Sequence, residues 1–116
     1  MKQLLLCFAV AGMPLANPAS AADPGSITII SPKDGAVLGG GGGNKLEYDV
    51  HLSPNGNHLH IYIDNQDPII NKSVSNCPCS IGLPALAAGK HVIAVKEATA
   101  GHALTGVQSA VTVNVK

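Results

Sequence analysis

The amino-acid sequence predicts an all-β fold, a two-layer β-sandwich of about seven strands. Three observations support this prediction. Short runs of alternating or β-branched residues recur at intervals of roughly ten residues. Turn-forming Gly, Pro, Asn and Asp residues separate these runs, and no segment carries a convincing helical period. We therefore expect a succession of short strands in one domain, with no internal repeat.

Each expected strand is an alternating or β-branched run that ends at turn residues. In chain order these runs cover residues 26–30, 36–38, 45–52, 58–64, 69–73, 79–83, 90–97 and 107–115. The turns at 32–35, 53–57 and 64–68 are rich in Pro, Asn, Asp and Gly, whose backbones suit tight turns. The five glycines 39–43 have no side chains to pack, so we expect a loop there.

Residues 1–22 have the order of a secretory signal peptide, and residues 23–116 form the expected sandwich domain. Lys2 precedes an apolar run over residues 4–11, and small residues follow at 19–21. The apolar run is too short to span a bilayer as a helix. We therefore expect a periplasmic or secreted protein that has no membrane contact after cleavage.

The charge balance argues against nucleic acid and membrane surfaces as partners. The sequence contains no arginine, and the expected mature domain has six lysines against seven acidic residues. Such a surface offers neither the counterion release nor the bidentate base contacts that nucleic-acid binding uses. It also lacks a polybasic cluster for anionic lipids.

Two histidines in the run 58–64, His58 and His60, are the clearest functional signal. Side chains two positions apart on a strand point the same way, so both histidines share a polar face with Tyr62. Two imidazoles on such a face can converge on one metal ion. The pair predicts half of a metal site. The alternative is an ordinary polar face on which Tyr62 covers the histidines.

A third ligand must come from elsewhere in the fold. His102 is the first choice because it lies in a glycine-flanked loop, and His51 is the second because it lies on the outward face of the run 45–52. If that run paired with 58–64 as a hairpin, His51 would face His58 or His60. If the two runs belong to different sheets, His51 lies at the end of its strand, next to the turn at 53–57.

The two cysteines of the mature chain, Cys77 and Cys79, are separated by one proline. An exported protein favours a disulfide between them. Two thiolates at this spacing would instead suit a soft ion such as Cu(I), whereas imidazoles suit Cu(II), Zn or Ni. Both interpretations remain open at the level of the sequence.

The segment 86–95 resembles the Leu-x-x-Gly-x-Tyr-x-Val-x-Val corner of immunoglobulin-like domains, with His91 at the tyrosine position. In that corner the ring lies against the core and its polar atom bonds a nearby backbone group. We therefore expect His91 to be structural and the sandwich to be immunoglobulin-like.

The segments 31–38, 86–89 and 101–106 together resemble the small periplasmic copper-resistance proteins of the CopC type. That resemblance implies Cu(II) binding through an N-terminal histidine and an Asp-x-His motif before the last strand. His102 matches the loop histidine, but Ala100 stands where the aspartate would be. Copper binding here would therefore depend on His58 and His60.

The function predicted from the sequence is the binding of a transition metal, copper first and zinc second, for storage, delivery or resistance. A partner protein for metal delivery is part of this expectation. The alternative is a sandwich module that binds a protein or saccharide without a metal. We expect no enzymatic activity, because no nucleophile motif is present and Asp64 and Asp67 lie in a turn that explains them.

Overall fold

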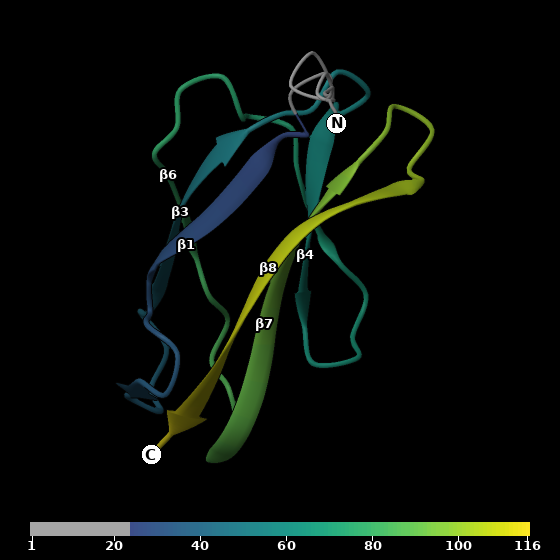
Figure 1. Ribbon diagram of the computed structural model, residues 1–116. Helices are drawn as coiled ribbons and strands as arrows, with labels where there is room; N and C mark the ends of the chain where they lie inside the picture. Colours follow the sequence, from purple (N-terminus) through teal and green to yellow (C-terminus); the bar gives the residue numbers. More distant parts are fainter. Residues whose placement is uncertain (1–23) are drawn as a thin grey trace, which may run out of the picture.

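The computed structural model describes residues 24–116, which form two β-sheets packed face to face (Figure 1). The strands are β1 (Ser26–Ser31), β2 (Val37–Leu38), β3 (Lys45–His51), β4 (His58–Ile63), β5 (Ile69–Asn71), β6 (Cys79–Gly82), β7 (Gly89–Ala98) and β8 (Leu104–Val115). The predicted all-β sandwich is confirmed, and each of the eight expected runs contributes a strand. The predicted signal peptide lies outside the described residues. Across 24–116, no helix has the length and hydropathy needed to cross a bilayer.

One sheet has three strands in the order β1-β3-β6, and the other has five in the order β2-β8-β7-β4-β5. All pairs are antiparallel except β2 with β8. The consecutive strands β3 and β4 belong to different sheets, so they form no hairpin. His51 at the end of β3 pairs with Ser26 of β1, not with the histidines of β4.

The core lies between the two sheets, where the apolar side of each strand turns inward. Leu46 and Tyr48 of β3 are fully buried, as the alternation of that strand predicts. The five-stranded sheet faces them with the fully buried side chains of Leu59, Ile61, Ile93, Val95 and Val113. Each such side chain contributes about 1.5–3 kcal/mol on burial. This alternation directs the other side of β4, with His58, His60 and Tyr62, to the outer face of the sheet.

His91 has the structural role predicted for it. It is partly buried on the inward side of β7, in line with Ile93 and Val95. Its Nε2 lies 2.7 Å from the carbonyl oxygen of Ala87, and its Nδ1 lies 2.6 Å from Oδ2 of Asp64. The sequence indicated the backbone bond but not the carboxylate. Both partners accept hydrogen bonds, so they favour the form of His91 in which both ring nitrogens carry a hydrogen, the imidazolium.

The turn between β7 and β8 folds the chain back beside β4. The pairing of β7 with β8 runs regularly to Lys96 opposite Gln108, then shifts so that Ala98 lies opposite Leu104. The extra residues of β8 form a bulge at Gly106, whose φ of 99° is accessible mainly to glycine. This bulge starts β8 earlier than the sequence predicted and places the turn that carries His102.

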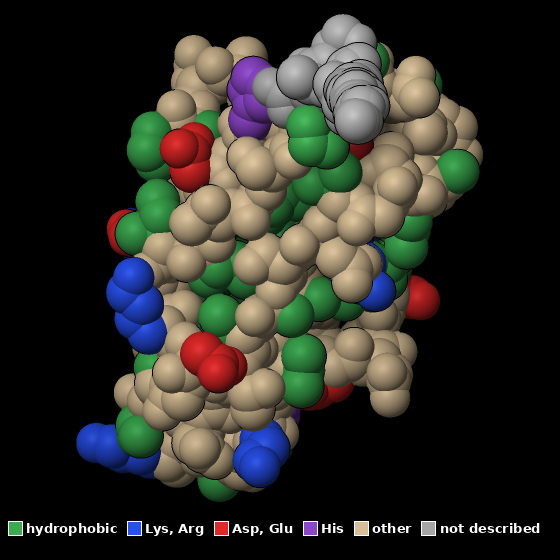
Figure 2. Space-filling model, viewed as in Figure 1, with side chains coloured by type: hydrophobic (Ala, Val, Ile, Leu, Met, Phe, Trp, Pro, Cys, Tyr) green, Lys and Arg blue, Asp and Glu red, His purple; other side chains and the backbone are tan. Residues whose placement is uncertain are grey.

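Charged side chains are scattered on the face of the molecule shown in Figure 2, where acidic and basic groups lie apart among uncharged atoms. No dominant patch of one sign is visible on this face. The view agrees with the near-neutral charge balance of the sequence.

Candidate metal centre

Three imidazole nitrogens form a small triangle on the outer face of the five-stranded sheet. The Nε2 atoms of His58 and His60 are 3.0 Å apart, and each lies 3.2 Å from Nδ1 of His102. Within residues 24–116, these three histidines are the one group of His, Cys, Asp or Glu whose ligand atoms lie close enough together to hold an ion.

The triangle has the dimensions of a metal site. Two nitrogens bound to one ion at about 2.0–2.1 Å lie about 2.9–3.4 Å apart for bond angles between square and tetrahedral. The three separations between His58, His60 and His102 all fall in this range. One ion can therefore bind all three nitrogens without displacing the rings far.

Hydrogen bonds alone cannot satisfy this arrangement. In each N–H···N bond one nitrogen donates and the other accepts. Three nitrogens in mutual contact always include at least one pair of two donors or two acceptors, and that pair is repulsive. A cation that accepts three lone pairs removes the conflict. The cluster of His58, His60 and His102 is therefore better suited to a cation than to a hydrogen-bonded network.

The remaining ring nitrogens of the β4 histidines have oxygen partners that orient them. His58 Nδ1 lies 2.9 Å from Oδ1 of Asn57, and His60 Nδ1 lies 3.3 Å from the hydroxyl oxygen of Tyr62. The amide oxygen of Asn57 only accepts, so His58 Nδ1 carries the hydrogen and Nε2 presents its lone pair to the cluster. The same tautomer suits His60. Oxygen partners of this kind fix the tautomer of metal-bound histidines.

Burial favours the neutral form of the two β4 histidines. His58 and His60 are 1% and 6% exposed, and this burial is the main cause that lowers the pKa of each ring. The charge of His102 lowers both pKa values further, and for His58 the charges of His60 and Lys72 add to the effect. Neutral imidazole is the form that binds a metal.

His102 reaches the cluster from the turn after β7, and its backbone has the left-handed φ of 72°. Its amide donates to the carbonyl oxygen of Thr99, and the amide of Thr99 donates to the carbonyl oxygen of Ala103. These bonds hold the turn closed. A non-glycine residue with this φ is uncommon. The residue that adopts it here, His102, is also the one exposed ligand of the cluster.

Glu97, for which the sequence predicted no role, joins the loop before β4 to the start of β8. It lies near the C-terminal end of β7, opposite Leu59, and is 0% exposed. Its carboxylate accepts bonds from the amide and hydroxyl of Ser53 at 2.8 and 2.5 Å, and from the hydroxyl of Thr105 at 2.6 Å. Burial raises the pKa of Glu97, but these hydrogen bonds outweigh it and hold the pKa below its usual value.

The Glu97 carboxylate also explains a glycine in the loop before β4. A Cβ on Gly56 would overlap the carboxylate oxygen Oε2 of Glu97. The next residue, Asn57, donates its amide to the carbonyl oxygen of Ala98 and orients His58. A lone glutamate in line with Ile93 and Val95 was the sequence signal that could have revealed this contact.

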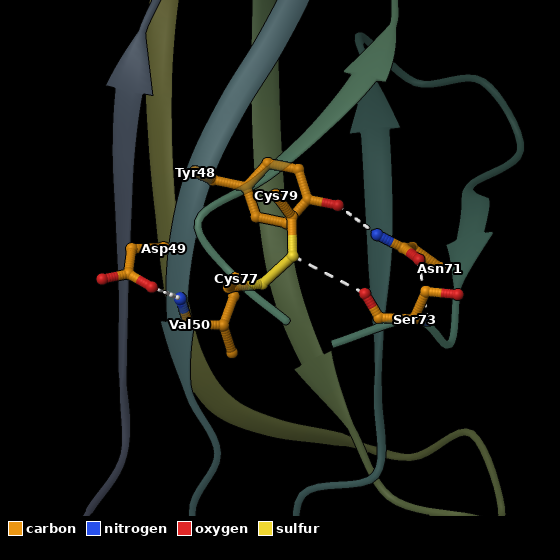
Figure 3. Close-up of a disulfide and its surroundings, with 7 residues drawn as sticks. All are labelled: Tyr48, Asp49, Val50, Asn71, Ser73, Cys77 and Cys79. Atoms are coloured by element: carbon orange, nitrogen blue, oxygen red, sulfur yellow. Dashed lines mark hydrogen bonds between the residues drawn. A yellow bond between two sulfur atoms is a disulfide. The ribbon is translucent and has the colours of Figure 1, made fainter. Parts of the chain in front are cut away.

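The other predicted ligands lie apart from the cluster. His51 is exposed at the end of β3 in the other sheet. Cys77 and Cys79 are joined by a disulfide, which Figure 3 shows beside Tyr48 of β3. Cys79 Sγ lies 3.6 Å from the carbonyl oxygen of Ser73. Of the two alternatives for these cysteines, the structure has the disulfide and not the pair of thiolates.

Comparison with known proteins identifies a fold. The sequence matches no protein-family model and no curated protein sequence. A fibronectin(III)-like module of Clostridium thermocellum CbhA is similar with a TM-score of 0.59 and 17% identity, over 78% of this chain and 95% of that one. Two structures of the extracellular domain of BT4673 from B. thetaiotaomicron are similar with a TM-score of 0.55 and 11% identity. They match 78% of this chain, which spans 15% of their length.

At these identities the similarity concerns the fold alone. No match supports the CopC family that the sequence motifs resemble. Residues 24–116 thus form a β-sandwich of the immunoglobulin-like and fibronectin(III)-like kind.

Proposed function

We propose that this chain is an exported, non-catalytic protein that binds a divalent transition metal through His58, His60 and His102. The observation that carries the proposal is the triangle of ring nitrogens with sides of 3.0, 3.2 and 3.2 Å. Its support is physical, since three nitrogens this close cannot satisfy one another by hydrogen bonds but can bind one ion.

Cu(II) is the first choice of ion and Zn(II) the second. A site made only of imidazoles suits both ions, and the general order of affinities places Cu(II) above Zn(II) for the same ligands. The resemblance of the loop around His102 to the copper-binding loop of CopC-type proteins favours the same ion. Storage, delivery or resistance is the role that fits a small sandwich of this kind outside the cytoplasm.

Export is part of the proposal because residues 1–22 have the order of a signal peptide. The similarity to an extracellular domain from B. thetaiotaomicron agrees with it.

Calorimetry of the chain from residue 23 onward tests the proposal. We expect one equivalent of Cu(II) to bind, and the double variant His58→Ala with His60→Ala to lose at least about 100-fold in affinity, as expected when ligands themselves are removed. His51→Ala is the matched control, because it removes an exposed histidine outside the cluster. Equal affinity in the double variant and the wild type would assign the binding elsewhere and leave a metal-free interaction module as the better description.

A further inference from the structure

We propose that the metal centre takes up a small free anion as an additional ligand, and that Lys72 and Lys96 favour this anion. The inference rests on the proposed function. It names the chemical class of the ligand that completes the coordination of the metal: a monoanion that donates through oxygen or nitrogen.

The register of the sheet places a lysine on each side of the β4 histidines. On one side, Lys96 of β7 lies directly opposite His60. On the other side, β5 pairs its last residue, Asn71, with Leu59, the neighbour of His58, and Lys72 follows Asn71 in the chain. Residues opposite each other in an antiparallel pair present their side chains on the same face. The side chain of Lys96 therefore lies on the outer face that carries the cluster, and Lys72 comes directly after the end of the strand on the other side of β4.

The ammonium group of Lys96 lies over an aromatic ring that contacts the cluster. Lys96 Nζ lies 5.1 Å from the ring centre of Tyr62, whose hydroxyl group contacts His60. Neither lysine forms an ion pair among the described residues.

No carboxylate of the described residues completes the centre. The group of close ligand atoms contains three histidines and no Asp or Glu. Asp64, just after β4, binds the ring of His91 and the amide of Val92. Glu97 lies on the inner face of the sheet, where Ser53 and Thr105 bind it. Three neutral protein ligands leave at least one position of a Cu(II) or Zn(II) ion for an exogenous donor.

The local charge selects the kind of donor. A divalent ion bound by three neutral imidazoles, with two ammonium groups beside it, forms a concentrated positive site. A water ligand leaves that charge unchanged, whereas an anion reduces it. A unit charge at about 6 Å from a bound anion changes its affinity on the order of three- to tenfold at the dielectric constants of a partly exposed site.

Titration of the Cu(II)-loaded chain with azide tests the inference, with the azide-to-copper charge-transfer band as the signal. The variants are Lys96→Gln and Lys72→Gln. Lys90→Gln is the matched control, because Lys90 lies on the same strand and face as Lys96 but about 20 Å along it. Pyridine, a neutral nitrogen donor, serves as the control ligand in parallel titrations.

We expect azide to bind the wild type and Lys90→Gln equally, and Lys96→Gln and Lys72→Gln about three- to tenfold more weakly. Pyridine affinity should be the same in all four proteins. The same two variants should bind Cu(II) itself more tightly than the wild type, because each removes a positive charge near the ion.

Three other results would overturn the inference in distinguishable ways. Copper uptake without any azide response would show that no position is open, and equal azide affinity in all four proteins would show that the lysines do not act on the anion. An azide response that weakens as protein concentration rises would assign the anionic donor to a carboxylate of a second chain. Absence of copper uptake would instead refute the proposed function itself.

Discussion

The Nε2 atoms of His58 and His60 lie 3.0 Å apart, although the Cα atoms of residues two apart on a strand are separated by about 6–7 Å. The two rings lean toward each other because Asn57 and Tyr62 hold their outer nitrogens. The third nitrogen comes from His102, in a turn that the bulge at Gly106 helps to place. The cluster therefore has the geometry of a ligand set.

Replacement of His102 should weaken metal binding without unfolding the domain. His102→Asn is the preferred variant, because asparagine tolerates the left-handed φ of 72° at this position. We expect Cu(II) affinity to fall at least about tenfold, and the urea midpoint to change little since the side chain is exposed. Calorimetry and urea unfolding measure the two quantities. Unchanged copper affinity in this variant would remove His102 from the ligand set.

Replacement of Glu97 should affect both stability and the metal centre. Glu97→Gln replaces the charged acceptor of the Ser53 and Thr105 hydrogen bonds with a neutral amide, which forms weaker bonds, and we expect a loss of about 1–3 kcal/mol in the free energy of unfolding. The loops that carry Asn57 and His102 should loosen, so copper affinity should fall as well. His91→Gln is the control, because it removes contacts at the corner of the sandwich and should leave copper affinity unchanged.

The glycine at position 56 should not tolerate a side chain. Gly56→Ala places a methyl group against the buried carboxylate of Glu97, and we expect a destabilisation of about 1–3 kcal/mol. Gly39→Ala is the matched control, since a Cβ at Gly39 would meet open space. Urea unfolding of both variants measures the difference. Equal stability of the two variants would show that the loop moves away from Glu97 at no cost.

The pair of His91 and Asp64 should make stability depend on pH. A hydrogen bond to Asp64, and then one to the backbone of Ala87, raise the pKa of His91 above its ordinary 6.5. The bond from His91, followed by the amide of Val92, lowers the pKa of Asp64 below its ordinary 3.8. The stabilisation from His91 is complete below pH 6.5 and is lost as pH rises through its higher folded pKa. That from Asp64 is complete above pH 3.8 and is lost as pH falls through its lower folded pKa.

Unfolding free energies of the wild type and Asp64→Asn between pH 4 and pH 9 measure this effect. The difference between the two proteins should be largest from about pH 4 to about pH 6.5 and should shrink at higher pH. A difference that stays constant over the range would show that His91 is not an imidazolium in the folded protein.

The two cysteines should be dispensable for metal uptake. They are bonded to each other beside Tyr48 of β3 (Figure 3). Strand β3 belongs to the three-stranded sheet, whereas His58 and His60 are on β4 in the other sheet. We expect the double variant Cys77→Ser with Cys79→Ser to bind Cu(II) as the wild type does under oxidising conditions. Loss of Cu(II) binding together with an intact fold would return the thiols to the list of candidate ligands.

The sequence predicts much of this fold because alternation is a local property. The runs that became β3 and β4 give both the strands and the direction of their side chains, and so place His58 and His60 on one side. Which strands pair is not local, since β3 and β4 are consecutive yet join different sheets. The position of His51 therefore required the structure.

Local sequence patterns also could not predict the contacts around the cluster. Ser53, Glu97 and Thr105 come from three segments, and their meeting depends on the packing of one sheet on the other. The sequence favoured His102 as the third ligand because it lies in a glycine-flanked loop and matches the loop histidine of the CopC resemblance. Its approach to His58 depends on a turn closed by Thr99 and on the shifted register of β8.

A crystal structure of the mature chain grown with Cu(II) tests the central claim most directly. The account predicts one ion at about 2.0 Å from Nε2 of His58, Nε2 of His60 and Nδ1 of His102. An ion bound only at other residues, or three imidazoles that remain in mutual contact with no ion among them at saturating copper, would contradict it.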